Sequence, residues 1–251
     1  TLTVSAESSN NITCTGSADG NVSFTINNPE ATAIDVSFEI YDSLSLDPTG
    51  VMGTSTVPAG GSVTVTDLGP LDFGNYFVLI TENSGANAGC NIVTPSFNIT
   101  ESAIDFNLTA SVTSNENCND LGVISAVGSD GTAPYQYQIL LESDPAPVAS
   151  SSGWATPNTF TVPADAYTVY AMDAYGCIRD VDVTLIQDAE PVIDPQTAPC
   201  YEGNPIPVTI TGSVSIGSPL YSINGTTFVS NPNFTISTPG TYTLYIQDGN
   251  G

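Results

Sequence analysis

The sequence predicts an all-β chain of tandem Greek-key β-sandwich units strung end to end, the last one incomplete, and three observations carry this prediction. First, Val, Ile, Thr, Tyr and Phe alternate with polar residues through most of the chain, and runs free of Gly, Pro, Ser, Thr and Asn are few. Second, turn signals recur every ~8–12 residues, which gives about seven strands per complete unit. Third, one strand motif occurs three times. Together these features are typical of Ig-like sandwiches.

The repeated motif is a Tyr followed by alternating apolar residues and, six positions after the Tyr, an acid. It occurs at Gly74–Glu82, Asp165–Asp173 and Gly240–Asp248. A period of two places the alternating residues on one face of a strand. A repeat of this length indicates tandem units rather than one large domain. We therefore predict units at residues 1–102, 103–188 and 189–251.

Unit one has a strand pattern in six places and turn chemistry in two. The strands are predicted over Thr1–Ala6, Val22–Ile26, Ile34–Tyr41, Val63–Val65, Tyr76–Ile80 and Phe97–Ile99, and the turns over Asp47–Gly50 and Pro58–Gly61.

Units two and three repeat this plan. In unit two the strands are predicted over Phe106–Val112, Val123–Val127, Pro134–Leu140, Phe160–Val162, Tyr167–Ala171 and Asp180–Ile186. In unit three they are predicted over Ile206–Thr211, Pro219–Ile223, Phe234–Ile236 and Tyr242–Ile246. The closing strand of unit three is expected past Gly251, or else as a strand donated by another chain.

The tyrosines of the motif, Tyr76, Tyr167 and Tyr242, stand at the start of the penultimate strand of each unit. A buried Tyr at this place can donate its hydroxyl hydrogen to the backbone of the preceding corner, as in the tyrosine corner of Greek-key sandwiches. The alternative is an ordinary core aromatic.

Five cysteines occupy corresponding places in the repeats. Cys14, Cys118 and Cys200 open their units, and Cys90 and Cys177 follow the Tyr strand. One bridge per unit is the economical pairing, namely Cys14–Cys90 and Cys118–Cys177, with Cys200 paired to a Cys beyond Gly251, although spacing alone does not fix connectivity. Disulfides imply an oxidising, extracellular compartment.

The charge balance is strongly acidic, with 26 Asp and Glu against one basic residue, Arg179, and no His. Such a surface repels nucleic acid and anionic membranes. It serves solubility, or it binds counter-ions, for which Ca²⁺ is the divalent candidate when the ligands are oxygens. The candidate ligands are the acids that end each Tyr strand and the acids that follow each first Cys: Glu82, Asp173, Asp248, Asp19, Asp120 and Glu202. The alternative is that these acids cap turns through the backbone.

The inventory of catalytic side chains is poor. Without His there is no Ser-His or Cys-His dyad, and without Lys there is no Schiff base. Carboxylate pairs remain, but no pair is singled out by its position. The sequence therefore predicts a protein that is not an enzyme and has no catalytic residues.

Units two and three carry a family resemblance. Pro134-Tyr135, Asp165–Cys177, Pro219–Asn224 and Gly240–Gly251 follow the order of Pro-Tyr strand, Gly-x-Tyr-Thr strand and Asp-x-x-Gly-Cys. This order resembles the SprB-type repeat of very large adhesins exported by the type IX secretion system of gliding bacteria. Unit one is similar only in Cys14, Asp19-Gly20 and Gly74–Cys90, and it lacks the Pro-Tyr strand.

The resemblance implies a secreted, surface-displayed filament, moved by the gliding machinery, in which the repeats make a stalk. The implied partners are a surface polysaccharide or solid surface and the outer-membrane motility and secretion machinery, contacted through other parts of the chain, with self-association into a filament as a further expectation. Asp42-Ser43-Leu44 resembles the short O-glycosylation acceptor of such bacteria, which makes Ser43 a candidate glycan site.

The function predicted from the sequence is a structural stalk segment of an extracellular, cell-surface adhesin filament. One alternative is a carbohydrate-binding module array of a secreted polysaccharide-degrading protein, which would need an exposed aromatic platform such as Trp154. Another is a polymerising fibre subunit, which would carry an open groove in unit three.

Overall fold

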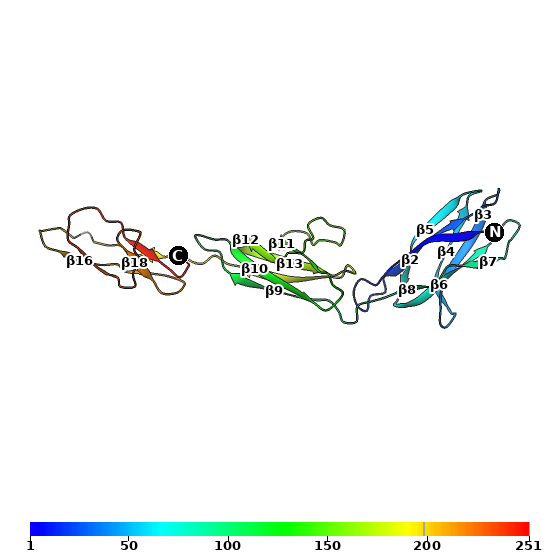
Figure 1. Cartoon of the computed structure of the whole chain (residues 1–251), viewed down its shortest axis with the longest axis horizontal. Coiled ribbons are helices and arrows are strands. Elements are labelled where there is room, and N and C mark those ends of the chain that lie inside the picture. The colour runs from blue at the N-terminus through cyan, green and yellow to red at the C-terminus, as the bar shows by residue number, and fades with distance from the viewer. Residues whose placement is uncertain (198, 251) are drawn as a thin grey trace.

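The structure is a computed structural model that describes residues 1–197 and 199–250. Three β-sandwich units follow one another in a row, with the N-terminus at the far end of unit one (Figure 1). The last described residues return to the junction between units two and three (Figure 1). Within the described ranges the regular elements are strands, and no helix could cross a lipid bilayer. The predicted fold, tandem Ig-like sandwiches, is confirmed.

Unit one is a Greek-key sandwich of two antiparallel sheets. One sheet has the order β1 (Thr3–Asn10), β2 (Gly20–Asn27) and β5 (Ser62–Leu71). The other has the order β4 (Pro48–Val57), β3 (Ile34–Asp42), β6 (Gly74–Glu82) and β7 (Asn91–Val93), with β8 (Phe97–Ile99) also paired to β6. The strict alternation of β2 and β3 buries every second residue in the core between the sheets.

Strand β4 was not predicted from the sequence, and the turn predicted at Asp47–Gly50 is wrong because β4 begins at Pro48. The strand lies at the edge of its sheet, and Val57 is the one of its ten residues that is buried. Edge strands tolerate Pro and Gly, so the usual hydrophobic pattern is missing. Gly53 is needed there because a Cβ atom would lie 2.6 Å from the ring of Phe38.

Unit two repeats the arrangement with two strands fewer. One sheet has the order β12 (Thr159–Val162), β10 (Gly122–Ser129) and β9 (Asn107–Ser114), and the other has the order β11 (Gln136–Leu141), β13 (Asp165–Met172) and β14 (Ile178–Leu185). A polar loop between β11 and β12 replaces the missing edge strand, and its Ala155 pairs with Tyr137 of β11. Trp154, in this loop, is half-buried and donates its indole hydrogen to the carbonyl of Val148.

Unit three has shorter strands in three pairs: β15 (Val192–Ile193) with β17 (Gly212–Ser213), β16 (Ile206–Thr209) with β19 (Asn233–Ile236), and β18 (Leu220–Ser222) with β20 (Tyr245–Gln247). Ile210 and Tyr221 are its buried apolar side chains among the described residues. Within the same residues no strand corresponds to β14 of unit two. A groove of about 420 Å³ opens beside the stretch before β20, between residues that include Ile206, Tyr242 and Leu244.

The tyrosine corner occurs in all three units. The hydroxyl groups of Tyr76, Tyr167 and Tyr242 donate to the carbonyl four residues earlier, at 3.2, 2.9 and 3.1 Å. The first two side chains are buried, and burial, followed by the nearby acids, raises their pKa above the usual tyrosine value. These tyrosines therefore fix the corner before the penultimate strand, as the motif predicted.

Candidate functional site

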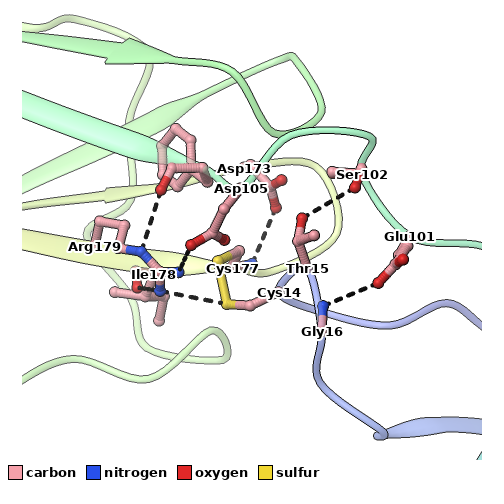
Figure 2. Close-up of polar contacts among 11 residues, drawn as sticks. Cys14, Thr15, Gly16, Glu101, Ser102, Asp105, Asp173, Cys177, Ile178 and Arg179 are labelled. Carbon is pink, nitrogen blue, oxygen red and sulfur yellow. Dashed lines mark hydrogen bonds and ion pairs between the residues drawn. A yellow bond between two sulfur atoms is a disulfide. The ribbon is translucent and has the colours of Figure 1, made fainter. Parts of the chain in front are cut away.

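The junction between units one and two combines a disulfide, an ion pair and several side-chain hydrogen bonds. A disulfide joins Cys14, in the loop after β1, to Cys177, just after β13, with a Cα–Cα distance of 4.8 Å and a sequence separation of 163 residues (Figure 2). Cys14 belongs to unit one and Cys177 to unit two. The bridge therefore binds one unit covalently to the next and runs beside the backbone linker, Thr100–Ala103.

The loop that carries Cys14 is held on the linker by hydrogen bonds. Gly16 donates its backbone hydrogen to the carboxylate of Glu101 at 2.9 Å, and the hydroxyl of Thr15 donates to the carbonyl of Ser102 at 3.0 Å (Figure 2). Gly16 has a φ of +80°, a backbone conformation that favours glycine. Ile12, buried at the start of the same loop, donates its backbone hydrogen to the carbonyl of Thr100.

On the side of unit two, Asp173 shapes the turn that presents Cys177. Its side chain is buried, and it accepts backbone hydrogens from Tyr175, Cys177 and Thr132 at 2.9 to 3.0 Å. The Asp173 backbone also donates to the carbonyl of Cys177. Both carboxylate oxygens are therefore satisfied, and the cysteine is fixed with its sulfur toward unit one (Figure 2).

Arg179, the one basic side chain of the sequence, also lies at this junction. Its guanidinium donates to the Asp105 carboxylate at 2.6 Å, to the carbonyls of Phe106 and Ile178 at 3.1 Å, and to the sulfur of Cys14 at 3.6 Å. The ion pair is partly exposed, so its own contribution is small, about 0.2–1 kcal/mol. Its geometric role is larger, because it joins the first residues of unit two, Asp105 and Phe106, to the disulfide.

The pairing predicted from the sequence, Cys14–Cys90 and Cys118–Cys177, is wrong, and the reason is strand direction. Cys14 follows the first strand of unit one and Cys90 follows the sixth. In unit one successive strands alternate in direction, so loops after odd and even strands lie at opposite ends of the sandwich. Cys90 lies beside Glu82, which accepts from Leu2 before β1, whereas Cys14 lies past the other end of β1, roughly 26 Å away. A disulfide needs Cα atoms within about 7 Å.

The remaining cysteines, Cys90, Cys118 and Cys200, are exposed and not bridged within the described residues. Cys118 lies at the junction between units two and three, where it lines a depression together with Ile246 and Gln247 of β20. At this junction Asp188 accepts hydrogens from Asn115 of unit two and Asn250 of unit three.

The acids proposed as calcium ligands contact backbone and hydroxyl groups. Asp19 accepts from the backbone and hydroxyl of Thr13, and Asp248 from the backbone of Asn250. Asp120 belongs to a turn closed by Asn117, and Glu202 is exposed. Glu82 and Asp19 lie at opposite ends of unit one, so they do not share a site. No group of three or more Cys, Asp or Glu side chains within the described ranges is arranged to hold a metal ion. Calcium binding stays a prediction, to be tested by comparing Tm in calcium and in EDTA.

Ser43, the predicted glycan site, has a buried hydroxyl without a hydrogen-bond partner in the part of the chain that the structure describes. Its backbone hydrogen is donated to the carbonyl of Asn75. Attachment of a glycan would need this loop to open or to be modified before folding, and the modification stays a prediction.

No known protein family matches the sequence, and no curated protein does. Among solved structures, the C-terminal 282-residue fragment of intimin in complex with the translocated intimin receptor is 12% identical, with a TM-score of 0.35, over 76% of this chain and 67% of that one. Three N-terminal domains of the outer capsid protein Hoc of bacteriophage RB49 are 13% identical, with a TM-score of 0.33, over 96% and 82%. The FN1–FN3 domains of chicken CNTN1 are 11% identical, with a TM-score of 0.26, over 97% and 86%. Likenesses of this size identify neither a family nor a ligand.

Sequence reasoning identified the cysteines and Asp173 but missed the role of Arg179 and Glu101. One signal was available: the one basic residue stands two positions after Cys177, next to the cysteine of the repeat motif. A lone cation in a chain this acidic indicates a specific contact.

Proposed function

We propose that this chain is a load-bearing segment of the stalk of a secreted, cell-surface adhesin filament, of the gliding-motility type exported by type IX secretion, and that it performs no catalysis. The SprB-type resemblance of units two and three supports the family, and the disulfide and the acidic composition support an extracellular place. The partners proposed are those of the filament as a whole: a polysaccharide or solid surface, and the outer-membrane machinery.

The observation that carries the proposal is the covalent path through the junction. Tension between the two ends of the chain passes along β1 to Cys14, across the disulfide to Cys177, and on through β14. The backbone between the two cysteines is outside this path. An adhesin stalk must keep its length under shear, and a bridge of this kind limits how far the chain extends when a unit opens.

The test is adhesion under flow of cells that display the protein with both Cys14→Ser and Cys177→Ser. The proposal predicts normal surface display and normal static attachment, with detachment at lower shear than the parent cells. Unchanged shear resistance would refute it. A Trp154→Ala variant is the matched control, because loss of static attachment in that variant would instead favour a carbohydrate-binding module.

A second candidate, the polymerising fibre subunit, is favoured by the groove in unit three. The stretch Gly240–Leu244 has no strand partner among the described residues, whereas its counterpart β13 in unit two pairs with both β11 and β14. A strand from a second copy would fill this place. Sedimentation of the purified chain under reducing conditions tests this candidate: non-covalent polymers support it, and a monomer refutes it.

A further inference from the structure

Each cysteine lies at a particular end of its unit, and the Cys14–Cys177 disulfide shows which ends pair. In units one and two, one cysteine lies in the loop between the first two strands, at the end that faces the following unit (Cys14, Cys118), and one follows the Tyr strand, at the end that faces the preceding unit (Cys90, Cys177). We name these the loop cysteine and the receiving cysteine. The Cys14–Cys177 bridge joins a loop cysteine to the receiving cysteine of the next unit.

Cys90 is the receiving cysteine of unit one, although its spacing differs from that of Cys177. It follows Glu82 by eight residues, whereas Cys177 follows Asp173 by four. Nevertheless the Glu82 backbone donates to the Cys90 carbonyl at 2.9 Å, as the Asp173 backbone donates to the Cys177 carbonyl at 3.0 Å. The longer loop therefore returns its cysteine to the same place on the fold, and there the thiol is exposed.

Glu82, beside Cys90, gives a second and independent observation. Its side chain is 1% exposed, and its Oε1 accepts from the Leu2 backbone at 3.3 Å. Its Oε2 is buried without a hydrogen-bond partner among the described residues, whereas both oxygens of Asp173 are satisfied. A buried acceptor without a donor is costly. In the existing junction, the loop that carries Cys14 supplies a hydrogen-bond donor to a carboxylate, since Gly16 donates its backbone hydrogen to Glu101. A loop of this kind docked beside Cys90 would supply the donor that Oε2 of Glu82 lacks.

The loop cysteine that remains accessible is Cys200, at the opposite end of the molecule. The hydroxyl of Tyr201, its neighbour, donates to the carbonyl of Ser237, just after β19, and β19 pairs with β16. β16 lies at the end of unit three that points away from unit two (Figure 1). Cys118, the other loop cysteine without a bridge, lies against β20 of unit three at an existing junction.

We propose that the Cys90 end of unit one is a receiving site for the loop cysteine of another unit of this repeat, and that Cys200 of a second copy of this chain fills it in a head-to-tail disulfide. The two thiols lose two protons and two electrons to a small-molecule disulfide such as oxidised glutathione, which leaves as two thiols. This junction would repeat the geometry of Cys14–Cys177 between molecules. The inference goes beyond the proposed stalk, because a stalk segment can carry load without it.

The test mixes two variants of the full chain, each with one of the three unbridged thiols. The first keeps Cys90 (Cys118→Ser, Cys200→Ser), the second keeps Cys200 (Cys90→Ser, Cys118→Ser), and one is isotope-labelled. Equal amounts equilibrate in a glutathione redox buffer, and intact mass gives the dimers. Random pairing makes half of the dimers mixed, whereas the proposal predicts that about four-fifths or more are mixed, since thiol exchange selects the most stable pair.

A third variant, which keeps Cys118 (Cys90→Ser, Cys200→Ser), is the matched control and is expected to pair with the Cys90 variant no better than at random. Mixed dimers at or below half, or equal pairing by Cys118 and Cys200, would overturn the proposal. Peptide mapping of Cys14–Cys177 and the Tm of each variant confirm that the units are folded. A failure here leaves the load path through Cys14–Cys177, and so the proposed function, unaffected.

Discussion

The Cys14–Cys177 bridge should shorten the chain that force can extend by a length that follows from the sequence. The bridge spans 163 of the 251 residues, so 88 residues remain on the loaded path when all three units are unfolded. At about 3.4 Å per residue, the oxidised chain should extend to roughly 300 Å and the reduced chain to roughly 850 Å. Reduction should therefore release about 550 Å of hidden length.

The assay is single-molecule force extension with handles at the two termini, before and after reduction. The three exposed cysteines are replaced by Ser in both samples, so that exchange with them is excluded; exposed substitutions of this kind cost little stability. The wild-type chain provides a second comparison, because within-unit pairs would hide 76 and 59 residues, or roughly 460 Å. An oxidised chain that extends as far as the reduced one would refute the load path, and a hidden length near 460 Å in the wild type would restore the pairing by unit.

Further expected outcomes concern stability. Glu7→Gln should raise Tm at pH 7, because burial raises the pKa of the Glu7 carboxyl and its Oε2 is buried without a partner in the described structure. An acid whose pKa is higher in the folded than in the unfolded state destabilises the fold once the pH rises past the unfolded pKa, so the gain in Tm should disappear below about pH 4. A gain that persists at about pH 3 would contradict this. Tyr167→Phe should lower the free energy of unfolding, measured by chemical denaturation, by about 1 kcal/mol, because it removes the hydrogen bond to the Pro163 carbonyl. Tyr242→Phe should lower it by less, because the hydroxyl of Tyr242 is exposed. Equal losses would contradict the burial argument. Asp173→Asn should lower the free energy of unfolding by about 1–3 kcal/mol, because an amide cannot accept all three backbone hydrogens, and it should slow re-formation of the Cys14–Cys177 bridge. Asp180→Asn, at an exposed position, is the control. Equal effects of the two substitutions on stability and on bridge formation would show that the turn does not depend on Asp173.

The sequence predicted the parts of the fold that depend on alternation. In β2, β3 and β6 every second residue is buried, because one face of each strand packs on the core between the sheets, so their burial is visible in the sequence. The tyrosine corners were predictable for the same reason, since the repeat places each Tyr at the start of its strand. Strand β4 was not, because an edge strand buries little and its residues resemble those of a loop.

The site could be predicted only in part, because a disulfide depends on the direction of strands rather than on the position of cysteines in a repeat. The repeat predicted that Cys90 and Cys177 are equivalent, and their backbone bonds agree. One bridge per unit is the economical pairing, but economy does not take the direction of the strands into account, and the pairing is wrong for that reason. Because β4 was not predicted, Cys90 follows the fifth strand of the prediction, and counting strands places it at the same end as Cys14. Only the observed sixth strand places the two cysteines at opposite ends.

The pairing across units also decides which part of the chain carries tension. Bridges within units one and two would protect each sandwich and leave the backbone from Cys90 to Cys118, which includes the linker, as the loaded connection. The Cys14–Cys177 bridge reverses this arrangement: the linker and most strands of both units lie off the loaded path, and β1 and β14 carry the force. Opening of either sandwich then lengthens the chain only as far as the bridge allows. The hydrogen bonds between Arg179 and the sulfur of Cys14 and between Ser102 and Thr132 cross the junction and keep the two units aligned before any unit opens. A rod assembled this way resists extension at its junctions, where a chain of independently bridged units is weakest.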